Sequence, residues 1–125
     1  MNGIKYLLDT NIIIGMYQRN PLVLEIIQTK RIAINQCAYS SITRMELLSF
    51  PNITEVEEQA IKTLLALMTN WSISPIIEDI AIDFRRRHQT KLPDSIIAAT
   101  AKAHQVELLS LDKHLANKLQ LSMTN

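Results

Sequence analysis

Four acidic residues occupy positions from which a carboxylate could do chemistry. Asp9 directly follows a short apolar segment, and Asp112 comes just after another. Glu46 and Asp94 lie inside segments with helical periodicity. Each of the four also has an ordinary structural explanation. Asp is a preferred helix N-cap and a carboxylate is favoured in the first turn of a helix, while Glu46 could be a solvated helix residue.

Carboxylates that converge in a partly desolvated cleft repel one another, and they stay ionised only if a cation lies among them. Oxygen ligands without cysteine or clustered histidine favour Mg²⁺ or Mn²⁺ over Zn²⁺. One or two such ions shared by four acids would suit attack of water on a phosphodiester. This chemistry requires a fold that brings the four acids together.

The elements that would position these acids alternate between short apolar runs and longer segments of helical period. We expect strands over residues 4–8, 32–39, 71–74 and 106–109, and a weak edge strand around Leu121. We expect helices over residues 10–16, 21–30, 41–48, 54–69, 75–88, 94–104 and 112–119. Pro21 suits the first helical position after an Asn20 N-cap, and Thr54 with Glu57 has capping-box spacing.

Two of these helices are expected to turn defined apolar faces towards the core. In the helix over residues 54–69, the repeating apolar positions are Val56, Ala60, Leu64, Leu67 and Met68. In the helix over residues 75–88, the inward positions are Ile76, Ile80, Ile82 and Phe84.

Strands separated by helices predict βαβ units and a mainly parallel sheet, with right-handed crossovers that place helices on both faces. The expected fold class is therefore α/β, a three-layer α/β/α sandwich. Ligands of such open sheets bind outside the carboxyl ends of the strands. Asp9 and Asp112 each follow a strand, so both should lie at this edge. The positions of Glu46 and Asp94 depend on how their helices pack.

Composition indicates one packed domain over residues 1–125, with 47% hydrophobic and 20% charged residues. The formal net charge of +1 argues against holding nucleic acid by bulk charge alone, but it permits a local basic patch. The only cysteine, Cys37, lies in an apolar run, which predicts a core residue and a reducing cytoplasmic location. No segment is typical of a signal peptide or a membrane span, so we expect no membrane association.

The four acids lie in four motifs that follow one another along essentially the whole chain. The motifs are LLDTN at residues 7–11, SITRMEL at 41–47, LPDSIIAATA at 92–101 and LSLD at 109–112. In these motifs the sequence resembles PIN-domain ribonucleases, and among them the VapC-type toxins of bacterial toxin–antitoxin pairs. The resemblance implies a single PIN-like domain with a three-layer α/β/α fold.

The resemblance also implies a function and roles for particular residues. It implies Mg²⁺ or Mn²⁺ dependence, endonucleolytic cleavage of RNA, inhibition by a cognate antitoxin protein, and a homodimer. Asp9 and Asp94 would be the central metal ligands. Glu46 would orient metal-bound water or act as a base, and Asp112 would complete the site or hold a second ion. Hydroxyl and amide groups beside the acids would orient them or the substrate: Thr10, Asn11 and Ser110.

The densest basic cluster spans residues 85–88, with Lys91 nearby. Arg85, Arg86 and Lys91 are candidates for binding RNA phosphates through charge and bidentate contacts. A solvated helix face explains the cluster equally well, because successive helical residues point in different directions. Pairing with the antitoxin is a further interpretation.

Two other functional classes compete with a nuclease. One is a non-catalytic PIN-like binding module, against which the complete set of acids argues. The other is an aspartate-based phosphotransfer domain, either a receiver or a haloacid-dehalogenase-like phosphatase. That phosphatase would need a second acid two residues after Asp9, but the residue there is Asn11. The paired acids of a receiver are also missing.

Overall fold

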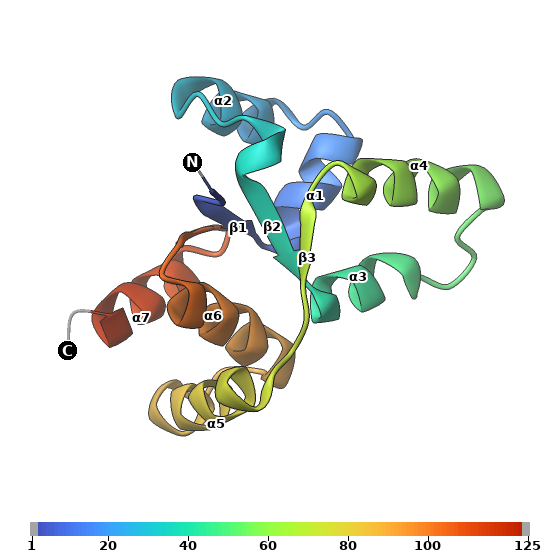
Figure 1. The fold of residues 1–125 in the computed structure, drawn as a ribbon. Helices are drawn as coiled ribbons and strands as arrows, with labels where there is room; N and C mark the ends of the chain where they lie inside the picture. Colours follow the sequence, from blue (N-terminus) through green and yellow to red (C-terminus); the bar gives the residue numbers. More distant parts are fainter. Residues whose placement is uncertain (1–2, 124–125) are drawn as a thin grey trace.

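A computed structural model describes residues 3–123, which form a sheet with helices on both faces (Figure 1). The strands are β1 (Tyr6–Leu8), β2 (Cys37–Ser40), β3 (Thr69–Trp71) and β4 (Glu107–Leu109), and they lie in the order β3-β2-β1-β4. Every neighbouring pair is parallel. The predicted α/β class with a parallel central sheet is confirmed.

The helices form the two outer layers. They are α1 (Thr10–Tyr17), α2 (Pro21–Thr29), α3 (Ser41–Leu48), α4 (Glu55–Ala66), α5 (Pro75–His88), α6 (Leu92–His104) and α7 (Lys113–Met123). Figure 1 shows α1, α2 and α4 on one side of the sheet and α5, α6 and α7 on the other. Helix α3 leaves the carboxyl end of β2 and contacts both α1 and α6, so it links the two layers at that edge.

Alternation along the strands divides the core into two layers, because successive side chains of a strand point to opposite faces. Leu8 and Leu109 pack with α1, α2, α3 and α4, whereas Leu7 and Leu108 pack with α5, α6 and α7. Cys37 lies in the first layer and is 2% exposed, as expected of a core residue. Burial raises the pKa of its thiol to about 11.

The helix starts expected from capping residues are confirmed. The Asn20 side chain accepts hydrogen bonds from backbone N–H groups of the first turn of α2, in which Pro21 is the first residue. Thr54 and Glu57 form a reciprocal capping box at the start of α4. These contacts are local in sequence, so they can be predicted without knowledge of the tertiary structure.

Three expected elements differ most from the structure. The second strand is shorter than residues 32–39, because Ile34–Gln36 form a 3₁₀ turn before β2. The third strand is Thr69–Trp71 rather than residues 71–74, and α4 ends at Ala66 instead of at residue 69. The expected edge strand around Leu121 is wrong, since α7 continues to Met123.

The predicted apolar faces of two helices are correct in part. Met68, just after α4, and Phe84, in α5, are buried as expected, but other predicted positions are not. In α4, Val56 is 80% exposed and Leu67, just after it, is 57% exposed, while Ile61 and Leu65 are buried. In α5, Ile76 and Ile82 are exposed, and the buried residues are Ile77, Ala81 and Phe84. Both helices contain more apolar residues than one face needs, so periodicity alone does not decide which face is buried.

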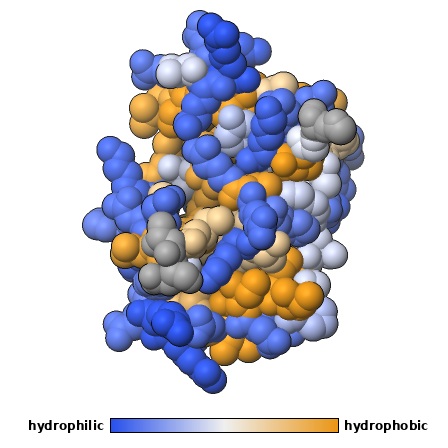
Figure 2. Space-filling view, turned by 60° about the vertical axis from the view of Figure 1, so that its left-hand side comes forward, coloured by the Kyte–Doolittle hydropathy of each residue, from blue (hydrophilic) through white to orange (hydrophobic). Residues whose placement is uncertain are grey.

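Apolar side chains also reach the surface. On the face shown in Figure 2 they emerge in several places among polar ones. None of the helices in the described part of the chain is both long and apolar enough to cross a membrane.

A close approach of two helices depends on Gly15, in the middle of α1. A Cβ atom added there would lie 3.0 Å from the Cβ of Val23 in α2 and closer still to its Cγ2. Val23 is fully buried, so it has little room to move. The absence of a side chain at position 15 therefore sets how closely α1 and α2 pack, and α1 begins directly after Asp9.

We predict that Gly15→Ala lowers the free energy of unfolding by about 1 kcal/mol, measured by urea denaturation. Overpacking costs about 1–3 kcal/mol, and the better helix propensity of Ala returns up to about 1 kcal/mol. In a Val23→Ala background, where the obstructing methyl groups are gone, the same change should be neutral or stabilising. A single Gly15→Ala variant more stable than wild type would contradict this account.

Candidate functional site

The site lies at the carboxyl edge of the sheet, where the strand order reverses. From β1 the chain first adds β2 and β3 on one side, then returns to place β4 on the other side of β1. The backbone N–H of Asp9 donates to the carbonyl of Leu109 at 2.9 Å, which joins the ends of these two adjacent strands. Such a switch point leaves a crevice for ligands in an open parallel sheet.

Asp9 is the central residue of this edge and is 5% exposed. It is the only charged side chain that is buried among residues 3–123. Its Oδ1 accepts a hydrogen bond from the backbone N–H of Thr10 at 2.7 Å. Its Oδ2 accepts one from the Ser110 hydroxyl at 2.6 Å and a longer one from the Asn11 amide at 3.4 Å.

The turn after β4 is fastened to the start of α1 by the same groups. The Asn11 side-chain oxygen accepts from the backbone N–H of Leu111 at 3.1 Å, and the Ser110 hydroxyl accepts from that of Asp112 at 2.9 Å. Asp112 is therefore held near Asp9. One oxygen of Asp112 accepts from the Leu115 N–H at 3.1 Å, so this acid also caps α7, as its ordinary structural explanation required.

Glu46 reaches the site from α3. Its Oε1 accepts a hydrogen bond from the Thr10 hydroxyl at 2.7 Å, which connects α3 to the first turn of α1. The Thr10 hydroxyl also lies 3.2 Å from that of Thr43. Thr10 has one hydroxyl proton, so when it is donated to Glu46, Thr43 donates to Thr10. The chain Thr43–Thr10–Glu46 thus fixes one carboxylate oxygen.

Sequence reasoning did not select Thr43 as a site residue. Its side chain is fully buried, and it precedes Glu46 by three residues, which places both on one side of α3. A threonine one turn before the candidate acid was the available signal.

Asp94 lies in the first turn of α6. Ser95 holds the segment that leads into this turn. Its buried hydroxyl donates to the backbone carbonyl of Lys91 at 2.9 Å and lies 2.5 Å from the side-chain hydroxyl of Thr90. No side chain within residues 3–123 caps α6, and Asp94 is the acidic group at the positive end of this helix.

The carboxylates act on one another electrostatically. Burial raises the pKa of Asp9; the hydrogen bonds from Ser110 and Thr10 oppose that rise, and the charges of Asp94 and Glu46 add to it. Burial also raises the pKa of Asp94.

The negative charges of Asp112 and Glu46 raise the pKa of Asp94 further, whereas the positive charges of Lys91 and Lys118 lower it. All four predicted acids therefore take part in one connected set of charges.

The acids do not form a preassembled metal cage. Within residues 3–123 no three histidine, cysteine, aspartate or glutamate side chains converge closely enough to form a ligand set. Mutual repulsion favours separated carboxylates in the absence of a counter-charge. The donors nonetheless fit a hard cation, because they are all carboxylate oxygens around one buried aspartate and no thiol or imidazole is among them.

The predicted basic residues lie beside this site rather than in it. Arg85 and Arg86 are exposed on the last turn of α5, and Lys91 is exposed in the connection to α6. The Arg85 Nε donates to the carbonyl of Thr90 at 3.2 Å. The three residues thus flank the chain segment that leads to Asp94.

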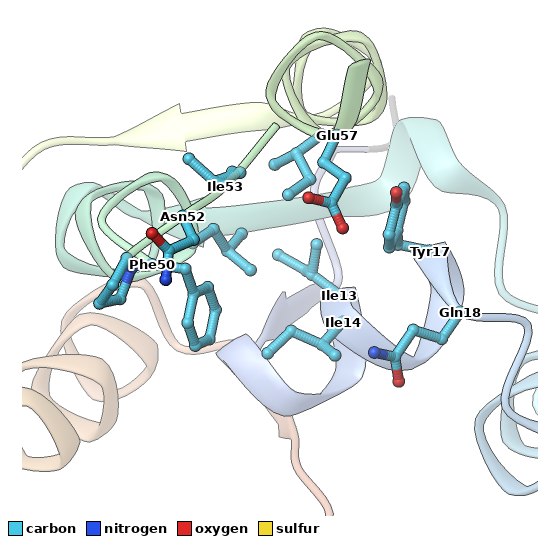
Figure 3. A pocket seen from close by; sticks show the side chains of 11 residues that line it. Ile13, Ile14, Tyr17, Gln18, Phe50, Asn52, Ile53 and Glu57 are labelled. Atoms are coloured by element: carbon cyan, nitrogen blue, oxygen red, sulfur yellow. The ribbon is translucent and has the colours of Figure 1, made fainter. Parts of the chain in front are cut away.

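A separate apolar pocket of about 340 Å³ opens between α1, α4 and the segment that joins α3 to α4 (Figure 3). Its lining includes Ile13, Ile14 and Tyr17 from α1 and Phe50 after α3. None of the four candidate acids lines it; the acidic residue there is Glu57, which is engaged in the capping box of α4.

Comparisons with known proteins show the same fold in solved structures. The search of curated proteins gives no match. A toxin–antitoxin complex from Klebsiella pneumoniae contains a similar chain, with a TM-score of 0.76 and 29% identity over 87% of this chain and 88% of that one.

Two other similar structures share the fold at lower identity. VapBC2 from Rickettsia felis, bound to a DNA fragment from its promoter, has a TM-score of 0.74 and 18% identity, covering 91% of this chain and 92% of that one. FitAcB from Neisseria gonorrhoeae has a TM-score of 0.70 and 20% identity, covering 92% and 93%.

The family model of the PIN domain matches residues 6–118, from the first strand into the last helix. The matched region contains the four acids, the two hydroxyl groups bound to them, and the switch point between β1 and β4. This chain belongs to the PIN domain family.

Proposed function

We propose that this chain is a metal-dependent endoribonuclease, the toxin of a toxin–antitoxin pair. The observation that carries the proposal is the buried carboxylate of Asp9 at the switch point, electrostatically linked to Asp94 and Glu46. PIN domains are generally nucleases, which supports hydrolysis of nucleic acid. The family match gives no support to aspartate-based phosphotransfer.

Asp9 and Asp94 would hold a Mg²⁺ or Mn²⁺ ion, with Asp112 completing the site or holding a second ion. A bound ion of this kind would stabilise negative charge on the phosphoryl oxygens and lower the pKa of a bound water. The hydrogen bond from Ser110 orients Oδ2 of Asp9, and the turn that carries Ser110 also places Asp112.

Glu46 would act as the general base. Its Oε1 is engaged by Thr10, so Oε2 would take the proton from the attacking water as the new P–O bond forms. The ester P–O bond would then break, and the departing oxygen would take up a proton from solvent. Asn11 would hold the turn after β4 in place through its bond to Leu111.

An antitoxin partner and a homodimer belong to the same proposal, as do a single domain over residues 1–125 and a cytoplasmic location. The complex from Klebsiella pneumoniae supports the antitoxin partner. The apolar pocket beside α1 supports it too, because Tyr17 and Phe50 expose apolar surface there that a protein partner would cover.

A second candidate function is a PIN-like module that binds without catalysis. It is favoured by the lack of a preformed three-residue ligand set within residues 3–123. Calorimetry with Mn²⁺ separates the two proposals. A nuclease should bind Mn²⁺, with binding weakened by Asp9→Asn, whereas the absence of binding would favour the module.

We predict that Asp9→Asn and Asp94→Asn each reduce cleavage of a mixed RNA substrate in Mg²⁺ or Mn²⁺ to background. Each change removes a charge that the cation needs. The matched control is Asp79→Asn, an exposed aspartate on α5, which should retain wild-type cleavage. Cleavage by either site variant, or by wild type in excess EDTA, would refute metal-dependent hydrolysis at this site.

The hydrogen bond from Thr10 to Glu46 gives a separate prediction. Thr10→Val should lower kcat about 10- to 100-fold, because groups that orient catalytic carboxylates typically contribute that much. Thr10→Ser keeps the hydroxyl and should retain most of the activity. Equal losses in the two variants would show that the threonine methyl group matters rather than the hydrogen bond.

The raised pKa of Asp9 predicts the sign of a stability effect in EDTA. The ionised carboxylate is disfavoured in the folded state, so its cost is present at neutral pH and is lost as pH falls through the raised pKa. Asp9→Asn should therefore melt at a higher temperature than wild type at pH 7.5, with the difference narrowing towards pH 4. A difference that stays constant with pH, or has the opposite sign, would contradict this assignment.

A further inference from the structure

A groove beside the acidic site is lined by two arginines and, among the residues that the structure describes, by no acid. It has a volume of about 530 Å³ and lies at the end of α5 and the segment that follows. Its lining residues are Ile82, Arg85, Arg86, Gln89, Thr90 and Leu92. The groove therefore carries two positive charges, and its lining extends to within two residues of Asp94.

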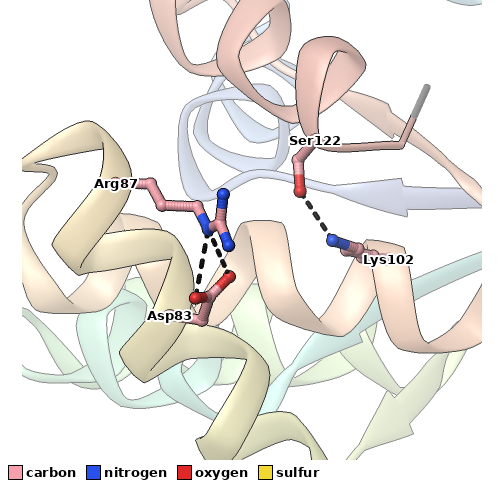
Figure 4. A network of polar contacts seen from close by, with 4 residues as sticks. All are labelled: Asp83, Arg87, Lys102 and Ser122. Carbon is pink, nitrogen blue, oxygen red and sulfur yellow. Dashed lines mark hydrogen bonds and ion pairs between the residues drawn. The ribbon is translucent and has the colours of Figure 1, made fainter. Parts of the chain in front are cut away.

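The arginines of α5 are not equivalent. Arg87 is neutralised by Asp83 on the preceding turn, with its Nε 2.9 and 3.1 Å from the two carboxylate oxygens (Figure 4). Arg86 takes part in no ion pair among residues 3–123, and neither does Arg85. The two unpaired arginines are the ones that line the groove, whereas Arg87 lines a different surface hollow beside Asp83.

The groove is held in a fixed position relative to the acids. The Arg85 Nε donates to the Thr90 carbonyl, and the Thr90 hydroxyl lies 2.5 Å from that of Ser95 in the first turn of α6. These two hydrogen bonds hold the groove beside the turn that contains Asp94. Positive charge continues up to the acid, since Lys91 and Lys118 both lower the pKa of Asp94.

We propose that this groove binds a backbone phosphate of the RNA strand on one side of the bond that is cut, with Arg86 and Arg85 as the phosphate ligands. The inference rests on the proposed nuclease function and specifies how its substrate is held. Guanidinium groups bind phosphate oxygens through paired N–H donors. The exposed side chains of Ile82 and Leu92 offer apolar surface to the adjoining ribose and base.

The charge pattern favours nucleic acid over an acidic protein segment as the occupant. When one phosphate of an RNA strand lies among the carboxylates, the neighbouring phosphates are repelled by the same negative charge. A positively charged surface next to the site offsets this repulsion. The groove supplies that surface through the segment 89–91, which joins it to the first turn of α6. An acidic partner would have no requirement for this continuity with Asp94.

The test measures binding of a fluorescein-labelled single-stranded RNA of mixed sequence by fluorescence anisotropy, in the Asp9→Asn background so that the RNA stays intact. Arg86→Gln should weaken binding several-fold and reduce the slope of log K against log salt by about 0.7, the value for one phosphate contact in a single strand. Arg87→Gln removes the same formal charge outside the groove. It should leave affinity and slope unchanged.

Only Arg86 is substituted in this test. Arg85 also donates a hydrogen bond to the Thr90 carbonyl, so replacing Arg85 would disturb the segment 89–91 as well. Equal effects of Arg86→Gln and Arg87→Gln would show that general charge rather than the groove governs binding, and would overturn the inference. Unchanged RNA binding in Arg86→Gln, or no RNA binding at all, would overturn it too.

Cleavage by the protein with Asp9 intact is measured in parallel, so that the two proposals fail separately. Arg86-dependent binding without cleavage would retain the groove and refute the nuclease. RNA cleavage together with RNA binding that does not depend on Arg86 would support the nuclease and refute the groove.

Discussion

One buried charge, the carboxylate of Asp9, constrains the carboxyl edge of the whole sheet. One of its oxygens bonds the first N–H of α1, and the other bonds Ser110 beyond β4, so a single side chain connects the beginning of the fold to its last strand. An ionised carboxylate that is 5% exposed is costly in the absence of a cation. This buried carboxylate lies within the region that matches the PIN domain family, and the charges of Asp94 and Glu46 act on it.

Charge around this position changes sign over a short distance. The acids Glu46, Asp94 and Asp112 approach Asp9 from three different helices or turns, while Lys91 and Lys118 oppose the field at Asp94. Beyond them, the last turn of α5 adds Arg85 and Arg86, which form no ion pair within residues 3–123. A chain with a net charge of only +1 can therefore combine a negative centre with a positive flank, provided that the fold separates the two.

Local signals predicted much of the fold correctly. The capping residues Asn20 and Thr54 marked two helix starts, and the alternation of strands and helices indicated the parallel sheet. Periodicity failed where apolar residues were too numerous, since Val56 and Ile76 fit a helical stripe as well as the residues that are buried. The tail around Leu121 was too short for its apolar residues to distinguish a strand from the continuing helix.

The sequence by itself determined the chemical inventory: four carboxylates, the hydroxyl groups beside them, and the adjacency of Asp9 and Asp112 to strand ends. Only the tertiary structure decided that Glu46 and Asp94 join them, because the packing of α3 against α1 and α6 sets their positions. The tertiary structure also showed that Thr43 forms a hydrogen bond with Thr10. It showed as well that Arg87 forms an ion pair with Asp83, which distinguishes it from Arg86. Each of these depends on the rotation of a helix about its own axis, which is set by packing between elements distant in sequence.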